Sequence, residues 1–286
     1  MALPIFGEFM LNMSVPVFDA LFSDYSFAKH NPMSLAMQDC LDTLQAHRID
    51  KEADTLEAFY ESVKLRAENI DSAAGKQKIV VELYDKFFRN AFPRMTERLG
   101  IVYTPVEVVD FIIHSINDIL KSEFGQTLGD KNVHIMDPFT GTATFVTRLL
   151  QSGLITKEQM PHKYKHEIHA NEIVLLAYYI AAINIEAVYH DIVGGEYQPF
   201  EGICLTDTFQ LYEKEDLVDE ILDVNSARRK RQKSLKDIRV IMGNPPYSAG
   251  QTSANDNNLL NRVKWLAFLE QTTCTRKCDT QIVDYE

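Results

Sequence analysis

The sequence predicts an α/β fold, in which a parallel β-sheet covered by helices follows a helical N-terminal region. Two observations support this prediction: short apolar runs alternate with longer helix-like segments after residue 130, and a polar residue closes each run at nearly constant spacing. Strands that alternate with helices form parallel sheets, because each crossover helix returns the chain to the same end of the sheet. Residues 1–98 show helix-like periodicity without strand-like alternation.

The composition is that of an ordinary globular protein. The 286 residues carry 29 Lys or Arg against 41 Asp or Glu, a net charge of −12, and 45% of them are hydrophobic. These values exclude disordered, collagen-like and coiled-coil classes. The acidity disfavours a protein that coats nucleic acid, although it is compatible with a local basic groove.

Neither a disulfide framework nor a metal site is expected. Four cysteines are too few for a disulfide framework in a chain of this length, and the close pair Cys274 and Cys278 lacks a second pair of zinc ligands. The longest apolar run, Ile173 to Ile183, has 11 residues, too few to cross a bilayer. The N-terminal residues also lack the basic start of a secretory signal, so we expect a cytoplasmic protein without a membrane partner.

A helix is predicted to begin at Thr104, where the character of the chain changes. Thr104 is expected to cap the helix, Pro105 to occupy its first position, and Glu107 to complete a capping box. Apolar residues recur on one face as far as Leu120, as in a helix that packs on a core.

Four apolar runs after this helix are predicted to be strands, and three helices are expected between them. The strands are Val133–Met136, Glu167–Ala170, Ile203–Leu205 and Ile238–Met242, and the helices cover 144–151, 173 to about 189, and 214–234.

One polar residue stands at the end of each predicted strand. Asp137, Glu172, Asp207 and Asn244 are spaced 35, 35 and 37 residues apart. Ligands of open parallel sheets bind in the crevice beyond the carboxyl ends of the strands. We therefore expect these four side chains to line one edge of the sheet and to mark the functional site.

The segment Asn244-Pro245-Pro246-Tyr247 carries the clearest chemistry. Its two prolines fix the backbone and remove two N–H donors. After a buried strand, the Asn244 side-chain oxygen and the Pro245 carbonyl then become rigid acceptors, and Tyr247 offers an aromatic face. This arrangement suits a planar substrate with an exocyclic amino group, and a plain turn is the alternative interpretation.

The turn at 137–145 is the second candidate. Gly141 allows a ligand to approach the backbone closely, and the start of the following helix favours an anion. The turn lacks the three-glycine fingerprint of NAD enzymes. Glu172 could accept the hydroxyls of a ribose and Asp207 an adenine amino group, although each could equally be a solvated carboxylate.

The segments Asp137-Pro138-Phe139-Thr140-Gly141 and Asn244-Pro245-Pro246-Tyr247 together resemble the amino-methyltransferases that make N6-methyladenine in DNA. Tyr103-Thr104-Pro105 resembles the N-terminal motif of their gamma group, in which the cofactor motifs precede the catalytic motif. The resemblance implies a Rossmann-like methyltransferase sheet with S-adenosylmethionine as cofactor. It also implies that the partner is double-stranded DNA with a flipped adenine.

The resemblance further implies roles for individual residues. Asp137 and Gly141 would hold the methionine part of the cofactor, Glu172 its ribose and Asp207 its adenine. The cofactor-binding set is Tyr103, Thr104, Pro105, Asp137, Pro138, Gly141, Glu172 and Asp207, and the catalytic set is Asn244, Pro245, Pro246 and Tyr247. Ala143 departs from the pattern, since the family usually has a second glycine there.

Residues 97–107 and Ser248-Ala249-Gly250 resemble single-polypeptide (type I-like, ISP) restriction–modification enzymes, in which nuclease and ATPase regions precede a helical coupler and the methyltransferase. The expected division is a coupler-like region at 1–98, an incomplete methyltransferase domain at 99–258 and a tail without a recognisable motif at 259–286. Only 39 residues follow Tyr247, where the family has further strands and a target-recognition domain. We therefore expect an incomplete portion of a longer enzyme.

Other functions stay open alongside DNA methylation. The same tetrapeptide occurs in enzymes that methylate glutamine side chains of proteins, although these usually carry an Asp-x-Gly-type first motif. RNA adenine is another candidate substrate. From a different class, the chain could be an inactive remnant or a cofactor-binding scaffold.

A basic stretch precedes the fourth predicted strand and includes a single acidic residue, Asp237. A solvated helix face is the favoured interpretation, with contact to a DNA backbone as the alternative. The basic residues are Arg228, Arg229, Lys230, Arg231, Lys233, Lys236 and Arg239.

Overall fold

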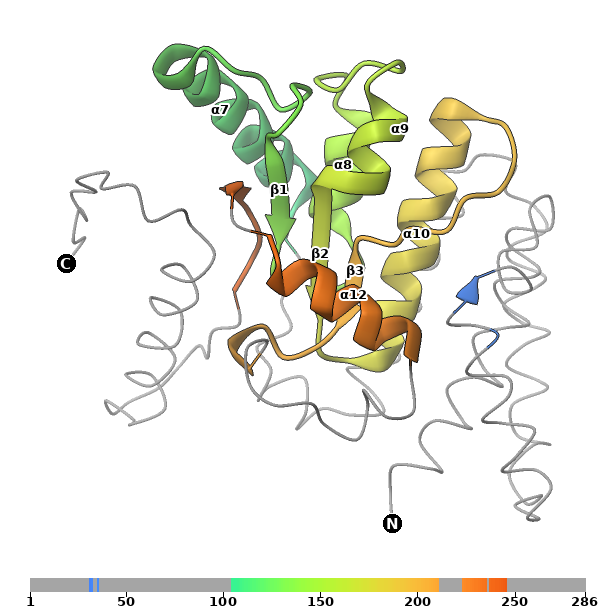
Figure 1. The fold of residues 1–286 in the computed structure, drawn as a ribbon. Helices are drawn as coiled ribbons and strands as arrows, with labels where there is room; N and C mark the ends of the chain where they lie inside the picture. Colours follow the sequence, from blue (N-terminus) through green and yellow to red (C-terminus); the bar gives the residue numbers. More distant parts are fainter. Residues whose placement is uncertain (1–30, 33–34, 36–103, 211–222, 236, 246–286) are drawn as a thin grey trace, which may run out of the picture.

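A four-stranded parallel sheet forms the centre of the fold (Figure 1). The computed structural model of the chain describes residues 31–32, 35, 104–210, 223–235 and 237–245; most of the predicted helical region 1–98 therefore lies outside the described residues. The strands are β1 (His134–Asp137), β2 (Ile168–Glu172), β3 (Ile203–Leu205) and β4 (Ile238–Ile241). Their order is β3-β2-β1-β4, and every neighbouring pair is parallel. The predicted fold class and the four predicted strands are confirmed.

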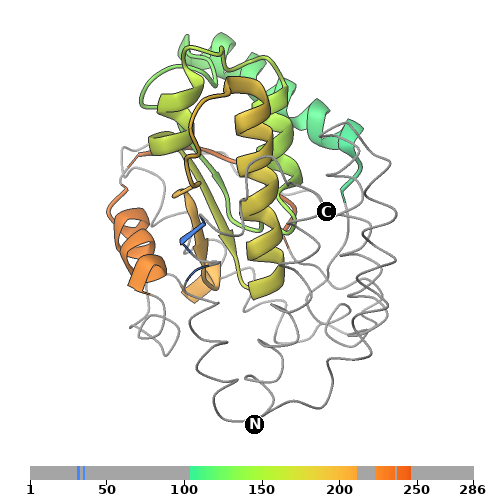
Figure 2. The ribbon, with the colours of Figure 1, turned by 90° about the vertical axis from the view of Figure 1, so that its right-hand side faces the viewer.

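Helices cover both faces of the sheet. Helices α8 (Thr144–Gln151) and α10 (Leu175–Val193) lie on one face, and α12 (Asp223–Lys233) lies on the other (Figures 1 and 2). This division follows from the strand order, because right-handed crossovers that run in opposite directions along a sheet place their helices on opposite faces. Helix α7 (Val106–Phe124) packs on α8. Among the described helices, none is long and apolar enough to cross a membrane.

The core lies between the sheet and the face formed by α7, α8 and α10. Helices α7 and α8 each bury an apolar stripe, as amphipathic helices do, whereas α10 is buried on all sides from Ala177 to Glu186. Fully or almost fully buried contributors are Val109, Ile113, Ile135, Leu149, Ile168, Tyr178, Ile185 and Ile203. The predicted helix at 144–151 is confirmed to the residue, and the predicted helix at 214–234 is confirmed over its described part.

The predicted capping box at the start of α7 is wrong. Pro105 is the N-cap, with φ −55° and ψ 140°, and no side chain caps the helix. The Pro105 carbonyl accepts hydrogen bonds from the backbone N–H groups of Val108 and Val109, at 3.0 and 3.1 Å. Because the extended ψ of Pro105 places Thr104 one residue outside the helix, the Thr104 hydroxyl is displaced from the cap position. The helix also continues beyond Leu120 to Phe124, where Gly125 ends it with a φ of 60°.

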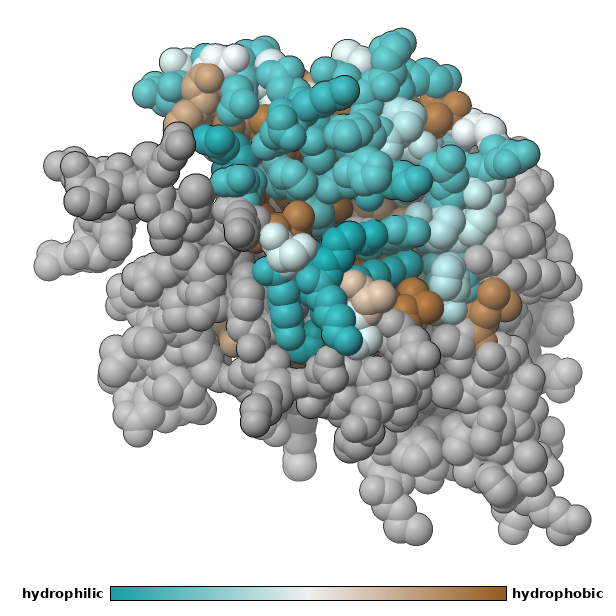
Figure 3. All heavy atoms as spheres, in the orientation of Figure 1, coloured by the Kyte–Doolittle hydropathy of each residue, from teal (hydrophilic) through white to brown (hydrophobic). Residues whose placement is uncertain are grey.

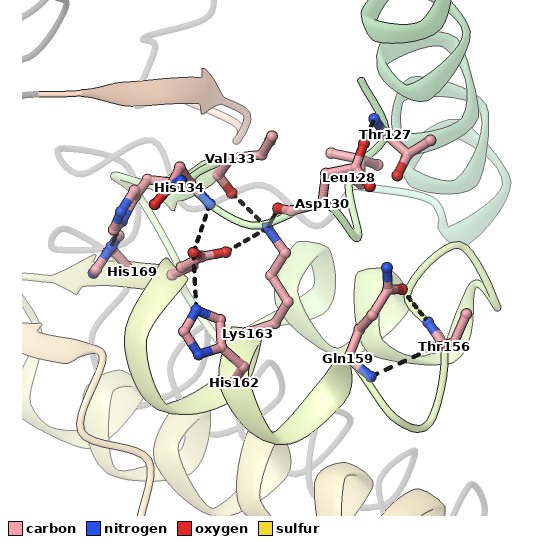
Figure 4. A network of polar contacts seen from close by, with 12 residues as sticks. Thr127, Leu128, Asp130, Val133, His134, Thr156, Gln159, His162, Lys163 and His169 are labelled. Carbon is pink, nitrogen blue, oxygen red and sulfur yellow. Dashed lines mark hydrogen bonds and ion pairs between the residues drawn. The ribbon is translucent and has the colours of Figure 1, made fainter. Parts of the chain in front are cut away.

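A helical segment that the sequence does not predict precedes β2. It consists of α9 (Met160–His162) and a π-helical turn, η1 (Lys163–Glu167). Lys163 is only 1% exposed, and its ammonium group reaches the carbonyls of Asp130 and Val133 at 2.5 and 2.8 Å and the Glu167 carboxylate at 2.7 Å. Figure 4 shows how this lysine joins the chain entering β1 to the chain entering β2.

Candidate cofactor and substrate site

The two motifs meet where the strand order reverses. The chain passes from β1 to β2 in one direction along the sheet and from β3 back to β4 on the other side of β1. Asp137 ends β1, and Gly243 and Asn244 follow β4. A Cβ atom added to Gly243 would lie 2.6 Å from Asp137 Oδ1, so the two segments touch. The reversal point of an open parallel sheet is where ligands bind.

Asp137 has an unusual environment for a carboxylate. The side chain is 1% exposed, and its Oδ1 accepts a hydrogen bond from the Phe139 backbone N–H at 3.1 Å. No donor among the described residues reaches Oδ2. Burial raises the pKa of Asp137 to about 8, and the neighbouring Glu172 carboxylate contributes to the increase. A buried oxygen without a donor requires a partner, and a ligand is the natural candidate.

The turn after β1 is held by its own hydrogen bonds. The Thr140 hydroxyl donates to the Asp137 carbonyl at 3.0 Å, and the Thr140 N–H donates to the Asn171 carbonyl of β2 at 2.9 Å. Gly141 has a φ of 55°, a conformation that glycine adopts without strain. A Cβ atom added to Gly141 would meet no atom within 4 Å, so the turn has open space beside it.

Ala143 departs from the family pattern at a position with a clear conformational demand. It has a φ of 71° and directly precedes α8 as its N-cap. Backbone in this left-handed region costs a non-glycine residue about 1–2 kcal/mol. The structure therefore accounts for the glycine that the family usually has at this position, and alanine is the smallest side chain that can replace it.

Glu172 lies beside the same turn, as predicted from its position at the end of β2. Its Oε2 accepts from the Gly141 N–H at 2.8 Å and its Oε1 from the Val174 N–H at 2.7 Å. Burial raises the pKa of Glu172 to about 7, against the effect of these hydrogen bonds. Each oxygen of a carboxylate has a second lone pair, so the group can hold the turn and still accept from a ligand. The role of Glu172 in holding the turn was not predicted from the sequence.

The end of β3 completes the edge. Asp207 is half-buried, and its Oδ1 accepts from the Phe209 N–H at 2.9 Å. The neighbouring Thr208 donates its hydroxyl proton to the Pro138 carbonyl at 2.5 Å and accepts from Asn171 Nδ2 at 3.3 Å. These contacts bind the β3 end to the turn after β1.

Two apolar rings and one helix residue add to the site without having been predicted. The rings of Phe139 and Phe209 lie 5.5 Å apart at 45°. On α10, Asn184 donates its Nδ2 to the Thr142 carbonyl of the turn at 3.0 Å. An asparagine directly after the apolar run Ile173 to Ile183 is a usable sequence signal, because buried polar side chains need partners.

The remaining predicted site residues are placed only in part. Asn244 is half-buried and Pro245 exposed, whereas Pro246, Tyr247 and Tyr103 lie outside the described residues. Thr104 and Pro105 precede α7, whose Asp110 forms a bidentate ion pair with Arg148 of α8, both distances being 2.7 Å. This pair joins the second turns of α7 and α8, so the start of α7 lies toward the same end as the turn after β1.

The basic stretch divides into a buried and an exposed part. Lys230, Arg231 and Arg239 are exposed, as the interpretation of a solvated face expects. Arg228 and Arg229 are buried, so neither a solvated face nor a DNA contact describes them. Arg228 Nη1 donates to the Tyr178 hydroxyl at 2.8 Å, and Arg231 pairs with Glu201 at 2.8 Å. Figure 3 shows that hydrophilic side chains gather over α12 on this face. Lys236 lies outside the described residues.

Asp137→Asn is expected to change the pH dependence of stability. The folded state holds a proton on Asp137 between pH 4 and 8 that the unfolded state releases, because the folded pKa is raised from 3.8 to about 8. This contribution to the free energy of unfolding is full below pH 4 and is lost as the pH rises toward 8. Urea denaturation at pH 5.5 and at pH 8 measures the free energy of unfolding. Between these two pH values, this free energy should fall less for the Asp137→Asn variant than for the parent chain. Asp118→Asn, at an exposed position on α7, is the control, and equal losses for Asp137→Asn and the parent would contradict the assignment.

Comparison with known proteins agrees with this geometry. A family profile described as N-6 DNA Methylase matches residues 75–279, and one described as Type ISP restriction-modification enzyme, coupler domain, matches residues 10–75. No match is found among curated protein sequences.

Three solved structures are similar over most of the chain. The Type ISP enzyme LlaBIII bound to DNA has 50% identity and a TM-score of 0.74 over 88% of the chain. A nuclease-deletion mutant of the Type ISP enzyme LlaGI, in complex with a DNA substrate mimic, has 50% identity and a TM-score of 0.73 over 87%. The DrdV–DNA complex has 34% identity and a TM-score of 0.77 over 89%. This chain spans only 18%, 20% and 25% of the lengths of those three chains. The profile match covers most of the chain, and the chain therefore belongs to the N-6 DNA methylase family.

Proposed function

We propose that this chain carries the cofactor site and the catalytic segment of an enzyme that transfers a methyl group from S-adenosylmethionine to the N6 amino group of adenine in DNA, within a type ISP restriction–modification enzyme. The observation that carries the proposal is the buried Asp137 Oδ2, which has no donor among the described residues and belongs to a side chain that lies against Gly243, the residue before Asn244. Family membership and the DNA present in the related structures favour this reaction over other uses of the fold.

The described residues fit S-adenosylmethionine. Asp137 Oδ2 is suited to the ammonium group of the methionine part, because a cation would compensate the buried charge. The open space at Gly141 leaves room for the ligand beside the turn. Glu172 has an acceptor position for the ribose and Asp207 for the adenine amino group, and Pro138 fixes the backbone of the turn. Bound S-adenosylmethionine would supply an electrophilic methyl group.

The catalytic segment would act on the adenine amino group. This nitrogen is a poor nucleophile, because its lone pair is delocalised into the ring. Hydrogen bonds from the amino group to the Asn244 side-chain oxygen and the Pro245 carbonyl would localise the lone pair and orient it. No strong base is required, since the amino proton can leave after methyl transfer. Tyr247 would stack on the flipped adenine and offset part of the few kcal/mol that unstacking costs.

Gly243→Ala is expected to weaken cofactor binding about ten- to a hundredfold by displacing the Asp137 carboxylate. The added Cβ would lie 2.6 Å from Oδ1, within a buried site that has little freedom to adjust. Titration calorimetry with S-adenosylmethionine measures the change. Gly125→Ala is the control for backbone strain at a distance from the site, because its φ is 60°, its Cβ would meet no atom within 4 Å and it lies at the far end of α7. Equal affinities for the two variants would contradict the proposed position of the cofactor.

The reaction itself is tested with a longer enzyme that contains this chain and its natural continuation. Labelled S-adenosylmethionine is supplied with DNA, RNA or protein, and the modified product is identified after hydrolysis. Label at N6 of adenine in DNA is the expected result. Label on protein glutamine or on RNA adenine would instead establish one of the alternatives, and cofactor binding without transfer to any substrate would establish a scaffold.

A further inference from the structure

The side chain of Asn31, which is far from the sheet in sequence, contacts α10. It belongs to the region that matches the coupler domain of type ISP enzymes, and it is only 2% exposed. Its Nδ2 donates to Glu186 Oε1 on α10 at 2.8 Å, across 155 positions of the sequence. This hydrogen bond therefore links the part of the chain that matches the coupler with the part that matches the methylase.

Other hydrogen bonds hold the Glu186 carboxylate in the position from which it accepts from Asn31. It is 0% exposed, and its Oε1 also accepts from the Phe200 N–H while its Oε2 accepts from the Tyr197 hydroxyl, both at 2.9 Å. Burial raises the pKa of Glu186 to about 7, whereas hydrogen bonds and the charge of Arg228 act in the opposite direction. A buried carboxylate is stable only with a nearly complete set of donors, so Asn31 supplies an interaction that the site requires.

We propose that α10 is the docking helix for the coupler-matching region, with Glu186 as the positioning residue that anchors Asn31. The same helix carries Asn184, which donates to the Thr142 carbonyl in the turn after β1 at 3.0 Å. Residues two positions apart point to opposite sides of a helix. Helix α10 thus holds the turn of the candidate cofactor site on one side and the coupler-matching region on the other.

The chemistry of the contact predicts which substitutions disturb it. Asn31→Asp would replace the donor by a second carboxylate, which would face Glu186 across a hydrogen-bond distance in a buried position. Leu35→Asp places the same charge one helical turn later, where the side chain is half exposed and the backbone N–H donates to the Asn31 carbonyl. Leu35→Asp is therefore a matched control for charge on the same segment.

Hydrogen exchange of the full chain, followed by mass spectrometry without cofactor, tests the proposal. Asn31→Asp should accelerate exchange at least tenfold in peptides covering 31–35 and 183–200, with little change in a peptide covering β1, whereas Leu35→Asp should leave all three within twofold. In a Glu186→Gln background the effect of Asn31→Asp should fall below threefold, because the glutamine amide can donate to the new carboxylate.

Two results would overturn the anchor: equal acceleration by Asn31→Asp and Leu35→Asp, or an effect of Asn31→Asp that is the same in the parent chain and in the Glu186→Gln background. If Asn31→Asp prevents folding, Asn31→Ala removes the donor without adding charge. It should then accelerate exchange at least threefold in the same two peptides, and no acceleration would refute the proposal. Because cofactor is absent throughout, the outcome is independent of the proposed methyl transfer.

Discussion

Asn244→Ala is expected to lower the rate of adenine methylation about 10²- to 10³-fold in a longer enzyme that carries this chain. The substitution removes the side-chain oxygen that would accept from the adenine amino group as positive charge develops on it. Asn244 is half-buried and lies three residues beyond the end of β4, behind the buried Met242, so we expect the strand rather than the Asn244 side chain to set its backbone position. The affinity for S-adenosylmethionine should therefore change less than threefold.

Single-turnover methyl transfer to DNA separates this effect from binding. Asp118→Ala, on the exposed side of α7, is the control and should retain the parent rate. A methylation rate for Asn244→Ala within a few-fold of the parent would remove Asn244 from the catalytic set. A loss of cofactor affinity equal to the loss of rate would instead assign Asn244 to the cofactor site.

Lys163→Met is expected to reduce the free energy of unfolding by about 3–5 kcal/mol, the usual cost of breaking a buried ion pair. The substitution leaves Glu167, which is also buried, without its cation and leaves the carbonyls of Asp130 and Val133 without their donor. Glu167 Oε1 still accepts from the Asn132 N–H at 2.7 Å and lies 3.1 Å from His162 Nε2, so the carboxylate stays in place but loses its ammonium partner. Urea denaturation measures the loss.

A second substitution distinguishes the broken pair from lost packing. Lys163→Met combined with Glu167→Leu removes both charges, and its destabilisation should be smaller than the sum of the two single effects. Lys157→Met is the control at an exposed position and should change stability by less than about 0.5 kcal/mol. Equal stabilities of the Lys163→Met and Lys157→Met chains would show that the network in Figure 4 does not hold the two strand entries together.

The sheet and the location of the candidate site could be predicted because their signals are local. Each strand is a short apolar run, and a polar residue closes it at a spacing that one helical crossover imposes. Asp137 and Glu172 therefore came together at the edge as expected, since parallel strands place their carboxyl ends side by side. Gly243 lies against Asp137 because of the same topology, although the sequence alone did not identify Gly243 as a residue of the site.

Features that depend on tertiary partners could not be predicted. The buried Lys163 resembles any surface lysine in sequence, and only the carbonyls of a distant loop explain its position. Arg228 appeared within a run of basic residues, yet its partner is the Tyr178 hydroxyl on the helix before β3. The capping box failed for a similar reason, because the conformation of Pro105, rather than the residue types around it, decided where α7 begins.

Titration calorimetry of S-adenosylmethionine into the folded chain tests the central claim most directly, namely that the edge around Asp137 is a cofactor site. We expect saturable binding of one molecule per chain, lost in Asp137→Ala and retained in Asp118→Ala. Binding should strengthen from pH 6 to 7.5, because burial raises the pKa of Asp137 to about 8 and a larger fraction of its carboxyl is then ionised while the ligand's ammonium group keeps its proton. No heat of binding from a chain shown to be folded, or equal binding by Asp137→Ala, would contradict it.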